Sequence, residues 1–279
     1  MHQVALNPET QFIYSTSGSA SSIEKHNKAL EKLGVNLVYF TFPHDIDAAT
    51  YAGLLRSPIT RGAAVTGKGG LKSSIIPFLD EVEPIALKTL AVNTVVNKAG
   101  KLFGYNSDAI GLKTALEEGM QGRSIKTAVI YGNGGVSGVA YHVLAELGIK
   151  ATFVGRNAER VEAKKLELGL ENEKHFEGPY DLLVDATPIS SNADFLEAPY
   201  FKEILENCKL VFCHNMPEKD GKENHLQAYC KRETIDYIPG KLMYKGQLLK
   251  QYRELLQGFE TQGRKINDQD IIDAWGINK

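Results

Sequence analysis

The 279-residue sequence predicts an α/β protein with a doubly wound Rossmann domain, and three observations indicate this fold class. Short β-branched and aromatic runs alternate with helical patterns in the first third of the chain. A glycine-rich turn at residues 132–138 joins an apolar run to an amphipathic stretch. Further apolar runs follow, as expected for a parallel sheet. Since the length allows two domains, we expect an N-terminal α/β domain, a Rossmann domain and a cleft between them.

The N-terminal domain is expected to contain a mixed sheet and at least one amphipathic helix. A helix is expected over residues 23–33, because Ser21 and Glu24 have capping-box spacing and Gly34 marks the end. The tripeptide Lys98-Ala99-Gly100 predicts a hairpin turn. The segments expected as strands are 11–14, 36–42, 62–66, 94–97 and 101–104.

The second domain is expected to follow a helix over residues 109–118. Its first strand and helix are predicted at 127–131 and 136–147. The later strands are predicted at 151–154, 182–185, 210–213 and 235–237. A helix over 243–256 should pack back on the first domain, and the last twenty or so residues show no clear pattern. The expected domains are therefore 1–107 completed by 243–279, and 108–242.

Composition favours a cytoplasmic protein that binds small molecules. The net charge is -2 and basic residues are scattered, so the sequence predicts no nucleic-acid partner. No apolar run is long enough to span a membrane, and no secretory signal precedes the first domain. Cys208, Cys213 and Cys230 have no metal-site spacing, so we expect reduced thiols and no metal.

The glycine-rich turn has the sequence context of a dinucleotide-binding site. Glycine allows a tight turn and close approach of backbone N–H groups to a pyrophosphate, and the following helix N-terminus favours negative charge. An ordinary turn is the alternative, but the strand before and the helix after argue against it. The predicted cofactor-binding residues of this turn are Gly132, Asn133, Gly134, Gly135 and Val136.

The end of the next strand predicts a preference for NADP. An NAD enzyme would have Asp or Glu there for the ribose hydroxyls, whereas this chain has Arg156 and, four residues later, Arg160. Guanidinium groups suit a 2′-phosphate, because they donate charge-assisted hydrogen bonds. Two solvated arginines at a helix start are the alternative interpretation.

Several motifs occur in the order found in the shikimate dehydrogenase family, which the chain resembles from about residue 13 to residue 258. Each motif is weak alone, but their joint order and spacing are specific. They are Val65-Thr66 with a following lysine, Ala91-Val92-Asn93-Thr94, Gly104-Tyr105-Asn106-Ser107-Asp108, the glycine-rich turn, Asp185-Ala186-Thr187-Pro188, and Gly240-Lys241-Leu242-Met243 leading to Gln247. The family motif corresponding to Asp185-Ala186-Thr187-Pro188 is Asn-Ala-Thr-Pro.

The resemblance implies reversible hydride transfer between NADPH and 3-dehydroshikimate, which gives shikimate for aromatic amino acid biosynthesis. It also implies the roles of particular residues. Lys72 and Asp108 match the catalytic Lys and Asp, and Thr187 lies in a cofactor-binding motif. A lysine beside a carboxylate can protonate the developing alkoxide and accept the proton back. The implied substrate-binding residues are Ser15, Ser17, Thr66, Asn93 and Gln247.

The chain departs from the family pattern at three places. Counting forward from Val65-Thr66 puts Gly70 at the lysine position, whereas counting back from Pro77 gives Lys72, so Lys68 stays a rival. Gly18 replaces the usual Pro after the serine motif. His214-Asn215-Met216-Pro217 stands where the family often has Tyr-Asn-Pro.

These departures leave alternatives open for function and for single residues. A paralogue acting on quinate or another hydroxylated cyclic carboxylate is one alternative, and a catalytically silent NADP-binding regulatory protein is another. Taken singly, Asp108 could cap a helix and Lys72 could be a surface lysine. The sequence leaves monomer and homodimer equally open.

Overall fold

The structure is a computed structural model that describes residues 6–41, 46–66, 70–170, 178–215 and 222–277. The chain forms two compact units. Unit 1 contains Met1–Ser107 and Leu248–Lys279, and unit 2 contains Asp108–Gln247. The C-terminal boundary falls at Leu248 instead of residue 243, because helix α10 (Gly240–Leu255) contributes its first half to unit 2 and its second half to unit 1.

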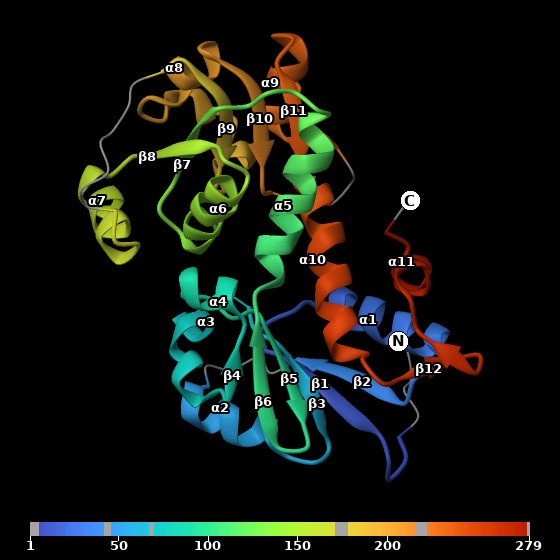
Figure 1. The fold of residues 1–279 in the computed structure, drawn as a ribbon. Helices are drawn as coiled ribbons and strands as arrows, with labels where there is room; N and C mark the ends of the chain where they lie inside the picture. The colour runs from blue at the N-terminus through green and yellow to red at the C-terminus, as the bar shows by residue number, and fades with distance from the viewer. Residues whose placement is uncertain (1–5, 42–45, 67–69, 171–177, 216–221, 278–279) are drawn as a thin grey trace. The chain divides into compact units, whose positions relative to one another are not determined.

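Unit 1 contains a mixed sheet of six strands in the order β2-β1-β3-β5-β6-β4 (Figure 1). Strand β1 lies parallel to β2 and β3, whereas β5 is antiparallel to both β3 and β6. The strand bounds are β1 Gln11–Ser15, β2 Leu37–Thr41, β3 Thr60–Ala64, β4 Glu81–Val82, β5 Thr94–Lys98 and β6 Lys101–Tyr105.

Helices α2 (Ala48–Leu55), α3 (Leu71–Ser74) and α4 (Pro84–Lys88) lie together on one face of this sheet (Figure 1). Their apolar side chains share a core with Tyr14 and Val95 from the strands. Since strand side chains alternate between faces, Ile13 points to the opposite face. Helix α1 (Ala20–Leu33) connects β1 to β2.

The C-terminal segment is ordered, contrary to the expectation of loose organisation. Strands β12 (Glu260–Thr261) and β13 (Arg264–Lys265) form a hairpin, and helix α11 (Asp268–Trp275) follows with an Asn267 capping box. Helix α11 packs on α1, where Lys32 Nζ donates to the carbonyl of Asp273 at 2.6 Å. The pattern was missed because its partners lie more than 200 residues earlier in the chain.

Two local expectations in unit 1 were wrong in detail. The N-cap of α1 is Ser19, whose side chain accepts from the backbone of Ser22, and Ser21 already lies within the helix. The hairpin turn has two residues, Ala99 and Gly100, with φ values of 54° and 87°. Two positive φ values match the twist of the flanking strands, which is the geometry of a type I′ turn.

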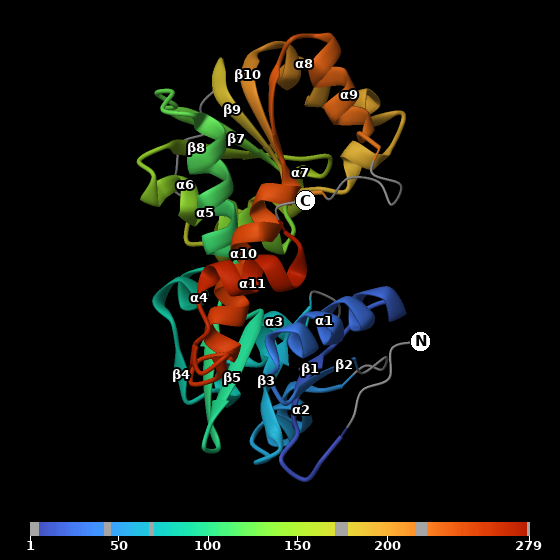
Figure 2. The same ribbon diagram turned by 90° about the vertical axis from the view of Figure 1, so that its right-hand side faces the viewer.

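Unit 2 contains five parallel strands in the order β11-β10-β9-β7-β8. The strand bounds are β7 Thr127–Tyr131, β8 Lys150–Val154, β9 Tyr180–Asp185, β10 Cys208–Cys213 and β11 Asp236–Pro239. Figure 2 shows α5 and α6 on one side of this sheet and α8 and α9 on the other. The helix bounds are α5 Ser107–Met120, α6 Gly135–Glu146, α7 Ala158–Glu167, α8 Phe201–Glu206 and α9 His225–Arg232.

The strand order reverses between β7 and β9, because β7 is followed in sequence by β8 on one side and β9 lies on its other side. Open parallel sheets bind ligands at such a switch point, outside the carboxyl ends of the strands. This is the doubly wound architecture expected from the sequence. Within the described residues, no helix is both long and apolar enough to cross a membrane.

Candidate functional site

A cluster of three hydroxyl groups lies at the carboxyl ends of β1 and β3. Thr66 Oγ1 lies 2.9 Å from Thr16 Oγ1 and 2.6 Å from Ser17 Oγ, and the backbone N–H of Thr66 donates to Thr16 Oγ1 at 2.8 Å. Ser15 is different, because it is fully buried and its hydroxyl donates to the carbonyl of Ser17 at 2.7 Å. Thr16, Ser17 and Thr66 are only partly buried, so their hydroxyls are the accessible ones.

Backbone hydrogen bonds bring Thr66, Lys72 and Asn93 into one region of unit 1. The N–H of Val65 donates to the carbonyl of Asn93 at 2.8 Å, and the N–H of Val92 donates to the carbonyl of Lys72 at 2.8 Å. The segment from residue 91 to 93 therefore lies between the two others. Residues from two motifs, Val65-Thr66 with its following lysine and Ala91-Val92-Asn93-Thr94, therefore lie side by side.

The side chain of Asn93 is fixed through its oxygen. Asn93 Oδ1 accepts from the backbone N–H of Ser107 at 2.9 Å, from Ser107 Oγ at 3.0 Å and from Thr94 Oγ1 at 3.0 Å. The amide nitrogen is buried and has no hydrogen-bond partner among the described residues. An unpaired buried donor costs about 1–3 kcal/mol. This amide nitrogen is therefore a buried donor for which the described residues provide no acceptor.

Of the two candidate catalytic lysines, the structure describes Lys72. Lys72 lies in α3, which begins after Gly70, a residue with a φ of 73°. Its side chain is partly exposed, as a residue that meets a ligand requires. The rival Lys68 lies outside the described residues, so the structure gives no comparison between them.

Asp108 and Gln247 both lie in unit 2. Asp108 is buried in the first turn of α5, where a carboxylate also interacts favourably with the helix dipole. Helices α5 and α10 cross closely at Gly111, since a Cβ there would lie 2.4 Å from the carbonyl oxygen of Met243 and 2.9 Å from the nitrogen of Gln247. Gly111 lies about one helical turn after Asp108 in α5. Because α10 approaches closely at Gly111, Gln247 lies about one helical turn from Asp108 along α5.

The glycine-rich turn joins β7 to α6 as expected. Gly132 has a φ of 123°, and a Cβ there would lie 2.7 Å from Thr187 Cγ2. A Cβ at Gly134 or Gly135 would meet nothing within 4 Å. Residue 132 is therefore glycine because of its backbone conformation and close packing. Gly134 and Gly135 instead leave open space at the N-terminus of α6. Asn133 and Val136 flank this space, and it suits a pyrophosphate.

Arg156 and Arg160 are both exposed after the end of β8. Asn157 caps α7 by accepting from the backbone of Arg160 at 2.9 Å, which leaves the guanidinium of Arg160 out of the cap. No carboxylate occupies the segment from Val154 to Asn157. The two guanidinium groups are available for an anionic ligand.

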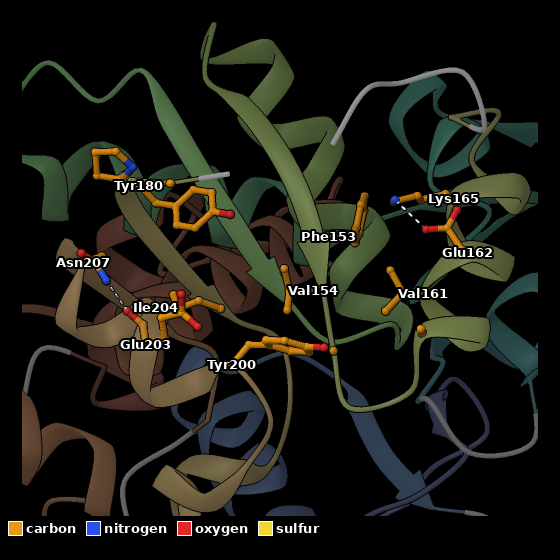
Figure 3. Close-up of a pocket in the computed structure, with 14 residues that line it drawn as sticks. Phe153, Val154, Val161, Glu162, Lys165, Tyr180, Tyr200, Glu203, Ile204 and Asn207 are labelled. Carbon is orange, nitrogen blue, oxygen red and sulfur yellow. Dashed lines mark hydrogen bonds and ion pairs between the residues drawn. The ribbon is translucent and has the colours of Figure 1, made fainter. Parts of the chain in front are cut away.

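A cavity of about 760 Å³ extends along β8 (Figure 3). Aromatic side chains from three elements line it, namely Phe153, Tyr180 and Tyr200, together with aliphatic Val154, Val161 and Ile204. Tyr200 is 62% exposed and has a φ of 64°, a strained conformation for a bulky residue. Sequence analysis missed this cavity, because its lining mixes apolar strand residues with polar helix residues from segments that are distant in sequence.

Asp185 ends β9 and is fully buried. Its Oδ1 accepts from the backbone N–H of Thr187 at 3.0 Å and from Thr187 Oγ1 at 2.6 Å, and Cys213 Sγ lies 3.5 Å from its Oδ2. Asn215 Nδ2 donates to the carbonyl of Thr187 at 2.7 Å. Burial raises the pKa of Asp185 to about 6, and the hydrogen bonds oppose that rise. The sequence showed an acid here but gave no sign of its burial.

The sequence predicts no metal site, and His, Cys, Asp and Glu are the side chains that would form one. Within the part of the chain that the structure describes, no three of these lie close enough to hold an ion. Cys208, Cys213 and Cys230 are all buried and free.

A glycine turn at a parallel-sheet switch point, with arginines at the next strand end, is typical of a dinucleotide-binding protein. Residues 16–95 match the shikimate dehydrogenase substrate-binding domain. The chain is 31% identical to shikimate dehydrogenase (NADP(+)) of Bacillus cereus over 213 residues, 69% of this chain and 72% of that enzyme. It is 33% identical to the Halothermothrix orenii enzyme of the same name, covering 72% and 76%. The chain belongs to the shikimate dehydrogenase family.

Solved structures share this fold over nearly the whole chain. A shikimate dehydrogenase in complex with NADP+ is 25% identical, with a TM-score of 0.74 over 98% of this chain and 97% of that one. The Thermus thermophilus enzyme in complex with shikimate is 24% identical, with a TM-score of 0.72 over 97% and 100%.

Proposed function

We propose that this protein is an NADP-dependent shikimate dehydrogenase that reversibly reduces 3-dehydroshikimate to shikimate, a step of aromatic amino acid biosynthesis. The observation that supports this most directly is the meeting of Thr66, Lys72 and Asn93 in unit 1, with the unpaired amide donor of Asn93. Two motifs about 20 residues apart in sequence converge on a polar region, which a ring with several hydroxyl groups needs.

The reaction requires a hydride and a proton. NADPH, when bound, supplies the hydride for the ketone carbon. Lys72 donates a proton to the oxygen as it becomes an alkoxide, and it accepts that proton again in the reverse direction. Asp108 orients the ammonium group and accepts a hydrogen bond from a ring hydroxyl. We assign these two residues the proton transfer.

Substrate binding is assigned to neutral donors and acceptors. Ser17 and Thr66 provide accessible hydroxyls, and Asn93 provides its amide nitrogen. Ser15 contributes through its hydrogen bond to the carbonyl of Ser17, which shapes the loop. Gln247 binds a ring hydroxyl from α10. Together they hold the carboxylate and the hydroxyl groups.

Cofactor binding is assigned to unit 2. The residues at the N-terminus of α6, from Gly132 to Val136, receive the pyrophosphate, since the open space at Gly134 and Gly135 fits it. Arg156 and Arg160 bind the 2′-phosphate. Thr187 contacts the cofactor from the loop that packs on Gly132.

Steady-state assays test this proposal and its main alternative. Purified protein is assayed with shikimate and with quinate, each against NADP+ and NAD+. We expect the highest kcat/KM with shikimate and NADP+. The absence of the usual Tyr at His214 favours the alternative of quinate or another hydroxylated cyclic carboxylate. A higher kcat/KM with quinate would establish that alternative, and NADP+ binding without turnover of either substrate would indicate a regulatory protein.

We further infer a cytoplasmic protein without nucleic-acid partners, acting as a monomer or a homodimer. The scattered charge and the net charge of -2 support the absence of a nucleic-acid partner. Sedimentation velocity distinguishes a particle of 30.7 kDa from one of twice that mass.

A further inference from the structure

Asp185 is a buried carboxyl group whose hydrogen-bond partners are uncharged. It is 0% exposed, and the ion pairs formed by the described residues include none with Asp185. Its partners are the N–H and hydroxyl of Thr187 and the thiol of Cys213. A buried carboxylate normally has a cationic partner, because desolvation strongly disfavours its charged form.

The location of Asp185 connects it to the glycine-rich turn. Asp185 pairs in register with Tyr131, the residue before Gly132. Both hydrogen bonds from Thr187 end on Asp185 Oδ1, and the methyl group of Thr187 closes against Gly132. Asp185 therefore fixes the loop that packs on the turn to which we assign the cofactor pyrophosphate.

We propose that Asp185 is a positioning residue that takes up a proton from solvent when NADP binds, so that NADP affinity falls as the pH rises. This inference rests on the proposed NADP site. A bound pyrophosphate places negative charge beside the turn, and an ionised Asp185 in a poorly solvated interior repels it. At an effective dielectric constant of about 20, one charge pair about 10 Å apart changes affinity roughly tenfold.

The pH range follows from the unliganded protein. The pKa of Asp185 is raised to about 6, so its carboxylate is largely ionised at pH 7 and protonated below pH 6. Bound anions raise that pKa further, because they disfavour the ionised form. Proton uptake is therefore largest between the pKa of the free protein, about 6, and the higher pKa of the bound protein. Well below pH 6 both forms are already protonated, and the affinity levels off.

The other titratable groups around Asp185 do not change charge in this range. Tyr131 faces it from β7, and burial raises the pKa of that hydroxyl to about 12. Cys213 faces it from β10, and its thiol pKa is raised to about 11. Burial lowers the pKa of the His214 ring, which favours its neutral form, and the His214→Gln variant separates its titration from that of Asp185. Charged or titratable groups that act on these neighbours are Arg156, Asp108 and Tyr237.

Isothermal titration calorimetry of NADP+ binding tests the proposal between pH 5.5 and 8.5, in buffers of different ionisation enthalpy. We expect the unmodified protein to take up protons above pH 6 and to bind roughly tenfold more weakly at pH 8 than at pH 6. Asp185→Asn keeps an Oδ1 acceptor for Thr187 but cannot ionise. It should take up no proton and should bind more tightly than the unmodified protein at pH 8.

Two controls separate this effect from other titrations. The 2′-phosphate of NADP titrates near pH 6 and favours binding as the pH rises, which is the opposite sign. His214→Gln should keep the proton uptake. Cys213→Ala removes a donor to Oδ2 and should move the midpoint to higher pH, which provides a test even if Asp185→Asn does not fold. Identical pH dependence in all four proteins would overturn the inference, whereas absence of NADP binding at every pH would overturn the proposed function instead.

Discussion

His26 in unit 1 and Asp185 in unit 2 are both buried titratable residues, but their hydrogen bonds require different charge states. Trp275 Nε1 lies 3.0 Å and Tyr252 Oη 2.6 Å from His26 Nδ1. An indole nitrogen only donates, so Nδ1 is an unprotonated acceptor. Burial accordingly lowers the pKa of His26 to about 4. Protonation would break the bonds that attach α10 and α11 to α1.

Asp185 differs because donors surround it. A carboxyl group accepts hydrogen bonds on one oxygen whether or not the other is protonated, so its bonds to Thr187 persist in both states. Each residue also contacts a segment with predicted binding residues through one neighbouring side chain, which is Thr187 for Asp185 and Tyr39 for His26. His26 stacks on Tyr39 at 4.2 Å, and Tyr39 is hydrogen-bonded to Ser15. The comparison indicates that a fall in pH should destabilise unit 1 and stabilise unit 2.

The largest expected effect separates the chemistry of unit 1 from cofactor binding in unit 2. Lys72→Ala should lower kcat by about 10²–10⁴-fold, the usual contribution of a positioned acid or base. NADP affinity should stay unchanged, because the cofactor is assigned to unit 2. Steady-state kinetics and calorimetry measure the two quantities.

Lys68→Ala is the matched control for Lys72→Ala and should change kcat much less. Asp108→Asn should also lower kcat, and the double variant with Lys72→Ala should lose less than the product of the two effects, because the residues act as one unit. Loss of turnover in Lys68→Ala alone would transfer the catalytic role to Lys68.

The second prediction concerns stability between pH 4 and pH 6.5. The unfolded chain binds a proton at His26 near pH 6.5, whereas the folded protein does so only near pH 4, so unit 1 loses about 3 kcal/mol as the pH falls through this range. Asp185 has the opposite sign. Its pKa is raised from 3.8 to about 6, so unit 2 gains about 3 kcal/mol as the pH falls from 6 to 4.

Hydrogen exchange measured by mass spectrometry resolves these opposed effects, which cancel in the global free energy of unfolding. Amides of α1 and α11 should exchange faster at pH 5 than at pH 7 after correction for intrinsic rates, while those of β9 and β10 should exchange more slowly. His26→Gln should remove the change in unit 1 only. Parallel changes in both units would contradict the comparison.

The third prediction tests the assignment of 2′-phosphate binding to the arginines of unit 2. Arg156→Asp should weaken NADP+ binding by roughly 10–100-fold, the value of one charge-assisted contact, and should erode the preference over NAD+. The KM for shikimate at saturating cofactor should stay within about twofold. Arg123→Asp, at an arginine already paired with Asp236 at the start of β11, is a control that should leave NADP+ binding unchanged. Equal kcat/KM with both cofactors in the unmodified protein would refute the assignment.

The smallest expected effect distinguishes two neighbouring serines. Ser17→Ala should raise the KM for shikimate severalfold with little change in kcat, since an anchoring contact is shared by ground and transition states. Ser15→Ala should mainly lower the free energy of unfolding by about 1 kcal/mol, because its buried hydroxyl donates to the carbonyl of Ser17. Chemical denaturation and steady-state kinetics of both variants measure the difference. A double variant with unchanged KM and kcat would place the carboxylate site elsewhere.

The sequence alone determined the elements whose signals are local. The strand at 127–131, the glycine turn and the helix after it follow from periodicity and turn chemistry over about twenty residues. The absence of an acid after Val154 and the presence of Arg156 are likewise visible without a structure. Element boundaries were less certain, as the shift of the α1 cap from Ser21 to Ser19 shows, because several serines there can cap a helix.

Only the tertiary structure decided the partners of single side chains. Nothing local indicates that Ser15 is buried while Ser17 reaches Thr66, 49 residues away. His26 meets Tyr252 and Trp275 across 226 and 249 residues. Asp185 looks like any strand-end acid until the structure shows that it is fully buried with Cys213 of β10 beside it. Backbone propensities depend on near neighbours in the chain, whereas burial and charge state depend on which distant segments exclude water from a group.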